Sequence, residues 1–138
     1  MAEALILDSE AVNALAHATE RAVLAERSRA ILQIAHERRA LVRVPAAVLA
    51  EVCPGPRFDG AVARLLNGRG IGVCVLTQGI AERAGGLLAK AKLSSSHAVD
   101  AFVVATALDF DSAVIATGDP GDIRRLSNAH RQVKVFAL

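Results

Sequence analysis

The sequence predicts an α/β sandwich, in a single domain over residues 1–138, with a mostly parallel sheet of about five strands flanked by helices. Short apolar runs alternate with longer helical segments along the whole chain, and parallel strands need such crossover connections. With 53% apolar and 22% charged residues, the chain can bury a substantial core. No repeat, linker or low-complexity segment interrupts this order.

The chain opens with a buried strand over Leu5–Leu7, which ends at Asp8. Asp8 can cap a short helix that reaches about Ala18. A second helix follows, and we expect it to place an apolar stripe on the core and its arginines elsewhere. The expected stripe consists of Val23, Leu24, Ile31, Ile34 and Ala35.

A second strand is predicted over Leu41–Val44. Pro45 suits the first turn of a helix, so Ala46–Val52 is expected to be helical until further prolines interrupt it. Another helix is predicted from Phe58 to Leu66, where an Asn-Gly pair stops it.

The second half of the chain continues the alternation. We expect a third strand over Ile71–Leu76, followed by a helix that Thr77 caps. The longest apolar helix is predicted from about His97 to Leu108. The fourth and fifth strands are expected over Ala113–Ala116 and Val133–Phe136.

The net charge of +2 does not by itself indicate a polyanionic partner, but the basic residues are unevenly distributed. They gather in two stretches: Arg21, Arg27, Arg29, Arg38, Arg39 and Arg43 in the first, and Arg124, Arg125, Arg131 and Lys134 in the second. We expect these stretches to steer a nucleic acid, the alternative for any single arginine being a solvated helix face.

The longest strongly apolar stretch, around Ala101–Leu108, is far shorter than the roughly 20 residues that span a bilayer, so we expect no membrane segment. The first residues show no basic region of a secretory leader. Cys53 and Cys74 form no Cys-x-x-Cys pair and are expected to be free thiols in a reducing compartment. The sequence therefore predicts a cytoplasmic protein.

Four carboxylates stand where a parallel sheet binds its ligands, beyond the carboxyl ends of the strands. Asp8 follows the first strand, Glu51 lies in the helix after the second, Asp100 begins the long apolar helix, and Asp119 follows the fourth strand. We expect these four side chains to converge at one edge of the sheet.

Each carboxylate also has a purely structural interpretation. Asp8 can serve only as a helix cap, Asp100 can complement the positive end of its helix, and Asp119 can be a turn residue within Gly118–Asp122. Glu51 interrupts an apolar segment in which an unpaired buried carboxylate would be costly, the alternative being a solvated helix face.

A cluster of like charges needs a cation. Two unit charges about 4 Å apart repel by roughly 1 kcal/mol in water and about 4 kcal/mol at an effective dielectric constant of 20. Ligand sets made only of oxygen suit Mg²⁺ or Mn²⁺ rather than zinc, and such ions promote cleavage of phosphodiesters. Basic side chains clearly outnumber the remaining acidic ones, which favours a nucleic acid as substrate.

Segments in the expected order resemble the motifs of PIN-domain proteins, and most closely those of the VapC-type toxins. They are Leu5–Ser9, the isolated Glu51, Asp100–Ala107 and Val114–Asp122. The resemblance covers nearly the whole chain and implies a PIN-like three-layer sandwich and a Mg²⁺- or Mn²⁺-dependent endoribonuclease that hydrolyses RNA. It also implies a homodimer and a VapB-type antitoxin that inserts a segment, often with an arginine, across the acidic pocket.

The resemblance assigns a role to individual residues. The acidic metal-binding positions of the family are matched by Asp8, Glu51, Asp100 and Asp119, with Asp122 at a further acidic position. Ser9 and Thr117 match hydroxyl positions that orient water or a carboxylate, the alternatives being a helix cap and a strand-end turn.

The sequence lacks the motifs of other enzyme classes. No phosphate-binding loop or Gly-x-Gly-x-x-Gly fingerprint is present, and the glycines of Gly68–Gly72 predict only a turn. The four histidines form no hydrolase triad; His97, one turn before Asp100, either approaches the site or merely starts a helix. A receiver domain would need an aspartate where Thr77 stands. The remaining alternative is a catalytically silent RNA-binding or partner-binding module.

Overall fold

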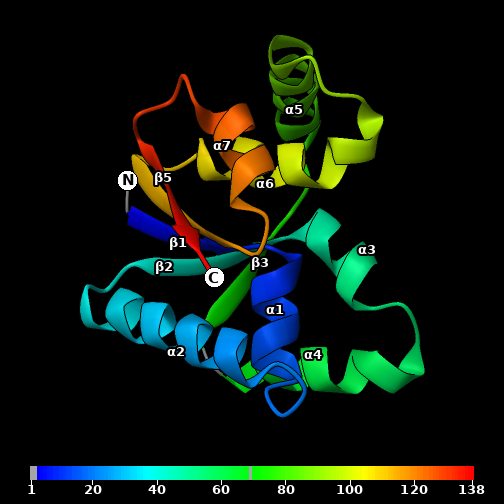
Figure 1. The fold of residues 1–138 in the computed structure, drawn as a ribbon, viewed down its shortest axis with the longest axis vertical. Helices are drawn as coiled ribbons and strands as arrows, with labels where there is room; N and C mark the ends of the chain where they lie inside the picture. Colours follow the sequence, from blue (N-terminus) through cyan, green and yellow to red (C-terminus); the bar gives the residue numbers. More distant parts are fainter. Residues whose placement is uncertain (1–2, 69) are drawn as a thin grey trace.

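The computed structural model describes residues 3–68 and 70–138, so Met1, Ala2 and Arg69 lie outside the described residues, and with them one position of the predicted Gly68–Gly72 turn. A five-stranded sheet with the order β3-β2-β1-β4-β5 lies between two layers of helices (Figure 1). Its strands are β1 (Glu3–Leu7), β2 (Leu41–Pro45), β3 (Ile71–Cys74), β4 (Ser112–Thr117) and β5 (Val133–Ala137). All neighbouring strands pair in parallel, which confirms the predicted α/β class.

The helices divide between the two faces of the sheet (Figure 1). One layer contains α1 (Ser9–Ala16), α2 (Ala22–Glu37) and α4 (Pro56–Gly68). The other contains α5 (Gln78–Ala91), α6 (Ala98–Ala107) and α7 (Pro120–Ser127). A 3₁₀ turn at Ala46–Val48 leads into the short α3 (Leu49–Val52), and a second 3₁₀ turn at Ser95–His97 precedes α6. None of the helices in the described part of the chain is long and apolar enough to cross a membrane.

The strand order changes direction between β1 and β4, and this switch positions the candidate site. Strand β1 pairs with β2 on one side and β4 on the other, with Leu7 opposite Ala116. The backbone N–H of Asp8 donates to the carbonyl of Ala116 at 3.2 Å, so the residues that follow these two strands lie beside each other. Ligands of open parallel sheets bind at such a switch point.

The core consists of the two central strands and the helices that cover them. Ile6, Leu7 and Ile115 are completely buried on β1 and β4. Helix α6 is buried along most of its length, including Val104 and Ala105, because it packs between the sheet and the other helices of its layer. Because α6 is covered on several sides, it carries apolar residues on nearly all of its faces.

The predicted stripe of α2 is wrong in part. Val23 is 72% exposed and Ile34 is 47% exposed. The buried positions are instead Ala25, Ser28, Leu32 and Ala35, of which only Ala35 was expected. These residues repeat every three or four positions, which places them on one face of the helix, and most of them are small. The buried face of α2 is therefore not its most hydrophobic face.

Two further differences between prediction and structure concern the end of one strand and the presence of one helix. The sequence predicts a third strand that reaches Leu76, whereas β3 stops at Cys74, so Val75, at 74% exposure, lies beyond the end of the observed strand. Helix α7 was not predicted, because the turn formers of Gly118–Asp122 hide its start. Its signals are Pro120 at the first helical turn and the buried pair Ile123 and Leu126 at helical spacing.

Several of the predicted steering arginines are engaged within the chain. Arg21 pairs with Glu10, and Arg38 pairs with Glu3 at 2.9 Å. Other guanidinium groups donate to backbone carbonyls: Arg27 to Ala137 at 2.6 Å, Arg43 to Val42 at 2.8 Å and Arg125 to Ala91 at 3.1 Å. These contacts within the chain are neither of the two predicted roles, steering of a nucleic acid or solvation of a helix face, and these arginines can contact a nucleic acid only by breaking an existing contact.

Candidate metal centre

Asp8 lies at the carboxyl end of β1 and caps α1, as its sequence position predicts. Its Oδ1 accepts from the backbone N–H of Ala11 at 3.0 Å and its Oδ2 from that of Gly118 at 3.3 Å. The hydroxyl of Thr117 donates a third hydrogen bond to this carboxylate. A carboxylate has about four acceptor sites, so capping leaves room for one further ligand contact.

Asp8 is only 6% exposed, and burial raises the pKa of its carboxyl above the ordinary value. The hydrogen bonds from Thr117, Ala11 and Gly118 oppose that rise, whereas the nearby charge of Glu10 adds to it. The three hydrogen bonds therefore stabilise the ionised carboxylate of Asp8, whereas burial disfavours its charge.

Thr117 links two of the predicted ligands. Its side chain is completely buried at the end of β4, donates to Asp8, and accepts from the backbone N–H of Asp119 at 2.9 Å. Thr117 thus forms the strand-end turn and supports a carboxylate at the same time.

Asp100 lies within electrostatic reach of the other predicted acidic residues. It lies in the first turn of α6, which begins at the edge where β1 and β4 end. Burial raises the pKa of Asp100 to about 6, and four like charges contribute to the shift. In decreasing order of effect these charges belong to Asp119, Asp8, Asp122 and Glu51, the acidic residues that the sequence singled out.

Glu51 and Asp119 are both exposed, and their charges contribute to the raised pKa of Asp100. The cost of burial that drew attention to Glu51 therefore does not apply to it. Instead, its carboxylate accepts a hydrogen bond from the hydroxyl of Ser9 across the start of α1. Asp119 stands before α7 and forms no side-chain capping bond to the described residues of that helix. Its carboxylate is thus available to a ligand.

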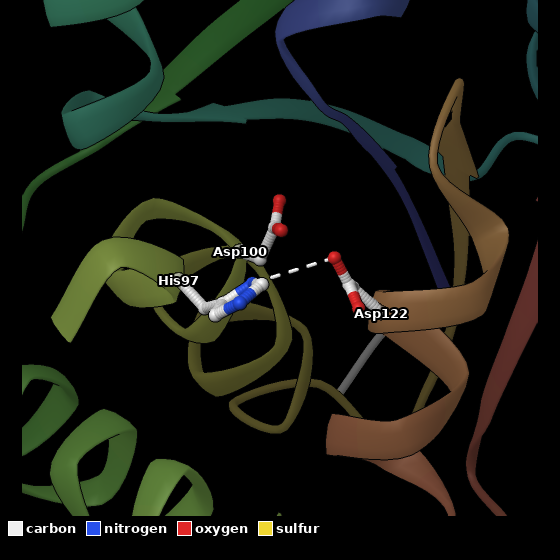
Figure 2. Close-up of side chains that lie close together, drawn as sticks. All are labelled: His97, Asp100 and Asp122. Atoms are coloured by element: carbon white, nitrogen blue, oxygen red, sulfur yellow. Dashed lines mark ion pairs between the residues drawn. The ribbon is translucent and has the colours of Figure 1, made fainter. Parts of the chain in front are cut away.

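His97 belongs to the site, which the sequence only suggested through its spacing of three residues from Asp100. Its Nδ1 lies 3.3 Å from Oδ2 of Asp122, and Figure 2 shows the two side chains directed toward each other with Asp100 beside them. One potential ligand atom from each of His97, Asp100 and Asp122 lies within 4.8 Å of the others. His97 also precedes the first residue of α6, so it starts the helix as well.

Gly118 keeps the connection after β4 close to α1. A Cβ at this position would lie 2.5 Å from Cγ and 2.7 Å from Cβ of Glu10. Because the carboxylate of Glu10 is held by Arg21, its side chain cannot move away without losing that ion pair. Glycine thus allows the Gly118 N–H to reach Asp8.

The residues present fit a hard divalent cation. Burial is the main cause of the raised pKa of Asp100, and the charges of four further carboxylates add to it. Of the acidic residues predicted from the sequence, the described structure brings ligand atoms of Asp100 and Asp122 within 4.8 Å of each other, whereas Asp8, Glu51 and Asp119 lie outside this closest group. Carboxylate oxygens are the ligands that Mg²⁺ and Mn²⁺ prefer, and a cation would remove the repulsion. His97 adds one nitrogen at the side of the cluster.

Replacing Thr117 with valine, which has nearly the same shape, is expected to destabilise the fold and weaken the site. Asp8 loses one hydrogen bond and the Asp119 N–H loses its acceptor, which costs about 1–3 kcal/mol in the free energy of unfolding. Thermal unfolding should show the loss, while Thr106→Val, whose hydroxyl only bonds a carbonyl within α6, is the control for activity. Unchanged activity in Thr117→Val would contradict the supporting role.

Comparisons with known proteins identify the family of the fold. The family model of the PIN domain matches residues 5–128. No curated protein matches the chain. PIN domains are generally nucleases that use divalent metals, and the acidic cluster of this chain lies on the matched segment. The match covers most of the chain, and on this evidence the chain belongs to the PIN domain family.

Proposed function

We propose that this chain is a Mg²⁺- or Mn²⁺-dependent endoribonuclease of the VapC toxin type, which hydrolyses phosphodiester bonds of RNA. The observation that carries the proposal is the environment of Asp100, whose pKa is raised first by burial and then by the charges of four other carboxylates, with a ligand atom of Asp122 and one of His97 within 4.8 Å. In a PIN domain, such a cluster supports metal-dependent hydrolysis.

The proposal assigns the carboxylates to the cation and two hydroxyl groups to the support of these ligands. Asp8, Glu51, Asp100 and Asp119 would hold the cation, with Asp122 as a further ligand. When bound, the cation would polarise the phosphate and lower the pKa of a water molecule. Ser9 orients Glu51, and Thr117 orients Asp8 and the backbone of Asp119.

The toxin assignment includes partners and a location. We propose a cytoplasmic homodimer that a VapB-type antitoxin inhibits by placing a cationic side chain among the carboxylates. The electrostatics of the site support this inhibition, because the same repulsion that favours a metal ion favours a guanidinium group.

Cleavage of RNA with and without metal tests the proposal. We expect single-stranded RNA to be cut in Mg²⁺ or Mn²⁺, and the activity to disappear in EDTA and return when the metal is restored. Cleavage that persists in EDTA, or a purified protein that cuts no RNA in either metal, would contradict it.

A silent binding module is the second candidate, and one observation favours it. The ion pair between His97 and Asp122 gives one carboxylate a partner without any metal. A silent module would bind RNA or a protein equally well with and without EDTA, and loss of the Asp100 charge would leave that binding unchanged.

A further inference from the structure

We propose that the groove between α4 and the connection from α1 to α2 holds a single-stranded segment of RNA that continues from the candidate metal centre. The inference rests on the proposed function and names the path of its substrate. It is carried by two adjoining hollows, by the face of α4 that lines one of them, and by an aromatic cluster between them.

The two hollows form one path. The first, of about 190 Å³, is lined by Glu51 of the metal centre together with Arg21 and Phe58. The second, of about 620 Å³, is lined by residues of the α1–α2 connection and of α4. His17 and Glu20 line both, so the hollows adjoin and lead away from Glu51 toward α4.

The face of α4 in the larger hollow has a cationic residue at each end. Arg57 and Arg64 are seven residues apart, which places them on one side of the helix about 10 Å apart along its axis. Between them lie Gly60, which has no side chain, and Ala61, which has a small one. Nη1 of Arg64 lies 3.6 Å from where a Cβ of Gly60 would stand, so this guanidinium group lies above that part of the helix. Both arginines are exposed, and neither forms an ion pair with any of the described residues.

An aromatic cluster stands where the two hollows meet. The guanidinium carbon of Arg57 lies 5.5 Å from the ring centre of Phe58, and the ring of His17 meets Phe58 edge-on at 5.4 Å. The Nε2 of His17 is buried and has no hydrogen-bond partner among the described residues. Aromatic rings and guanidinium planes are the surfaces on which unpaired bases stack, and Phe58 is one of only four phenylalanines in a chain without tyrosine or tryptophan.

The charges of the path favour RNA over a polypeptide. Arg57 and Arg64 are its two unpaired cations among the described lining residues, since Arg21 already pairs with Glu10. The described lining has a single carboxylate outside the metal centre, Glu20. A second basic hollow, of about 290 Å³, is lined by Arg124 and Arg131, but it shares no lining residue with this path. Of these two basic regions, the path along α4 is the one that adjoins the candidate metal centre. A phosphate backbone is the ligand that complements its positive charge.

The test removes the two arginines of α4. In Arg57→Gln/Arg64→Gln, a fluorescent single-stranded 12-nucleotide RNA should bind about tenfold or more weakly in EDTA, as measured by anisotropy. The slope of log affinity against log salt should fall by about 1.4, since each phosphate contact on a single strand contributes about 0.7. The matched control, Arg124→Gln/Arg131→Gln, loses the same charge and should keep the wild-type slope.

A second variant keeps the result interpretable if the double variant is less stable. Arg64→Gln leaves the contact of Arg57 with Phe58 intact and should reduce the slope by about 0.7. Equal slopes in the wild type, Arg64→Gln and the control would overturn the inference. So would a protein partner, such as an antitoxin, whose binding is lost in the α4 variants while their RNA binding is retained.

Cleavage separates this inference from the proposed function. With metal, the α4 variants should cut a trinucleotide as fast as the wild type does but lose efficiency on the 12-nucleotide RNA, because only the longer strand reaches α4. A wild-type protein that binds RNA through α4 but cuts nothing would refute the proposed function and support the groove. A protein that cuts both RNAs equally well in all variants would support the function and refute the groove.

Discussion

Replacing Asp100 with asparagine is expected to lower metal-dependent RNA cleavage by at least about a hundredfold. The carboxylate of Asp100 is partly buried and is influenced by the charges of four other acidic residues. Asparagine keeps the shape of the side chain but removes the charge that would attract the cation. Initial rates on a single-stranded RNA at saturating Mg²⁺ measure the effect.

A matched control is Asp59→Asn, an exposed aspartate in the first turn of α4 that belongs to no part of the candidate centre. It should retain wild-type activity. Equal activity of Asp100→Asn and the wild type would show that the cluster is not the catalytic site.

The same substitution should make the metal-free protein more stable at pH 7. The pKa of Asp100 is about 6 when folded, above its ordinary value of 3.8, so the folded state binds this proton more tightly. The free energy of unfolding therefore falls as pH rises from about 4 to 6, and the charged carboxylate destabilises the fold above that range. Thermal unfolding in EDTA should show a higher midpoint for Asp100→Asn at pH 7 and little difference at pH 4, which separates lost catalysis from a damaged fold.

Binding of a divalent cation is expected to stabilise the protein strongly and in a pH-dependent manner. At a free metal concentration about 100 times the dissociation constant, linkage predicts a gain of about 2.7 kcal/mol in the free energy of unfolding. The gain should be large at pH 7.5 and smaller at pH 5, because below a pKa of about 6 Asp100 must release its proton before it can bind the cation. Unfolding midpoints against Mn²⁺ concentration at both pH values measure it.

Salt of equal ionic strength without divalent metal is the control for this experiment. It should reproduce neither the size of the gain nor its dependence on pH. A metal effect of equal size at pH 5 and pH 7.5 would mean that Asp100 is not a ligand.

The sheet was predictable because its strands are short buried runs between helical segments. Leu5–Leu7, for example, is apolar on both sides and ends at a residue that caps the next helix. The ends of parallel strands share one edge of a sheet, and this rule predicts that the acidic residues converge. In the described structure, ligand atoms of Asp100 and Asp122 lie within 4.8 Å of each other together with one of His97, and the other three carboxylates act on Asp100 through their charge.

Other features depend on packing that the sequence does not display. Hydrophobicity predicts that Val23 and Ile34 are buried in α2, but both are exposed. The buried face of this helix consists mainly of small residues instead. The bond from Ser9 to Glu51 joins residues 42 positions apart, so no local pattern indicates it. The pair of His97 and Asp122 likewise requires α6 and α7 to lie side by side, and α7 was itself hidden by turn-forming residues.

Calorimetric titration of Mn²⁺ into the metal-free protein tests the central claim most directly. The account predicts a saturable site in the wild type and in Asp59→Asn, with binding weakened at least about tenfold in Asp100→Asn, since a charged ligand is lost. A wild type that takes up no Mn²⁺, or an Asp100→Asn variant that binds it as tightly, would show that these carboxylates do not form a metal centre.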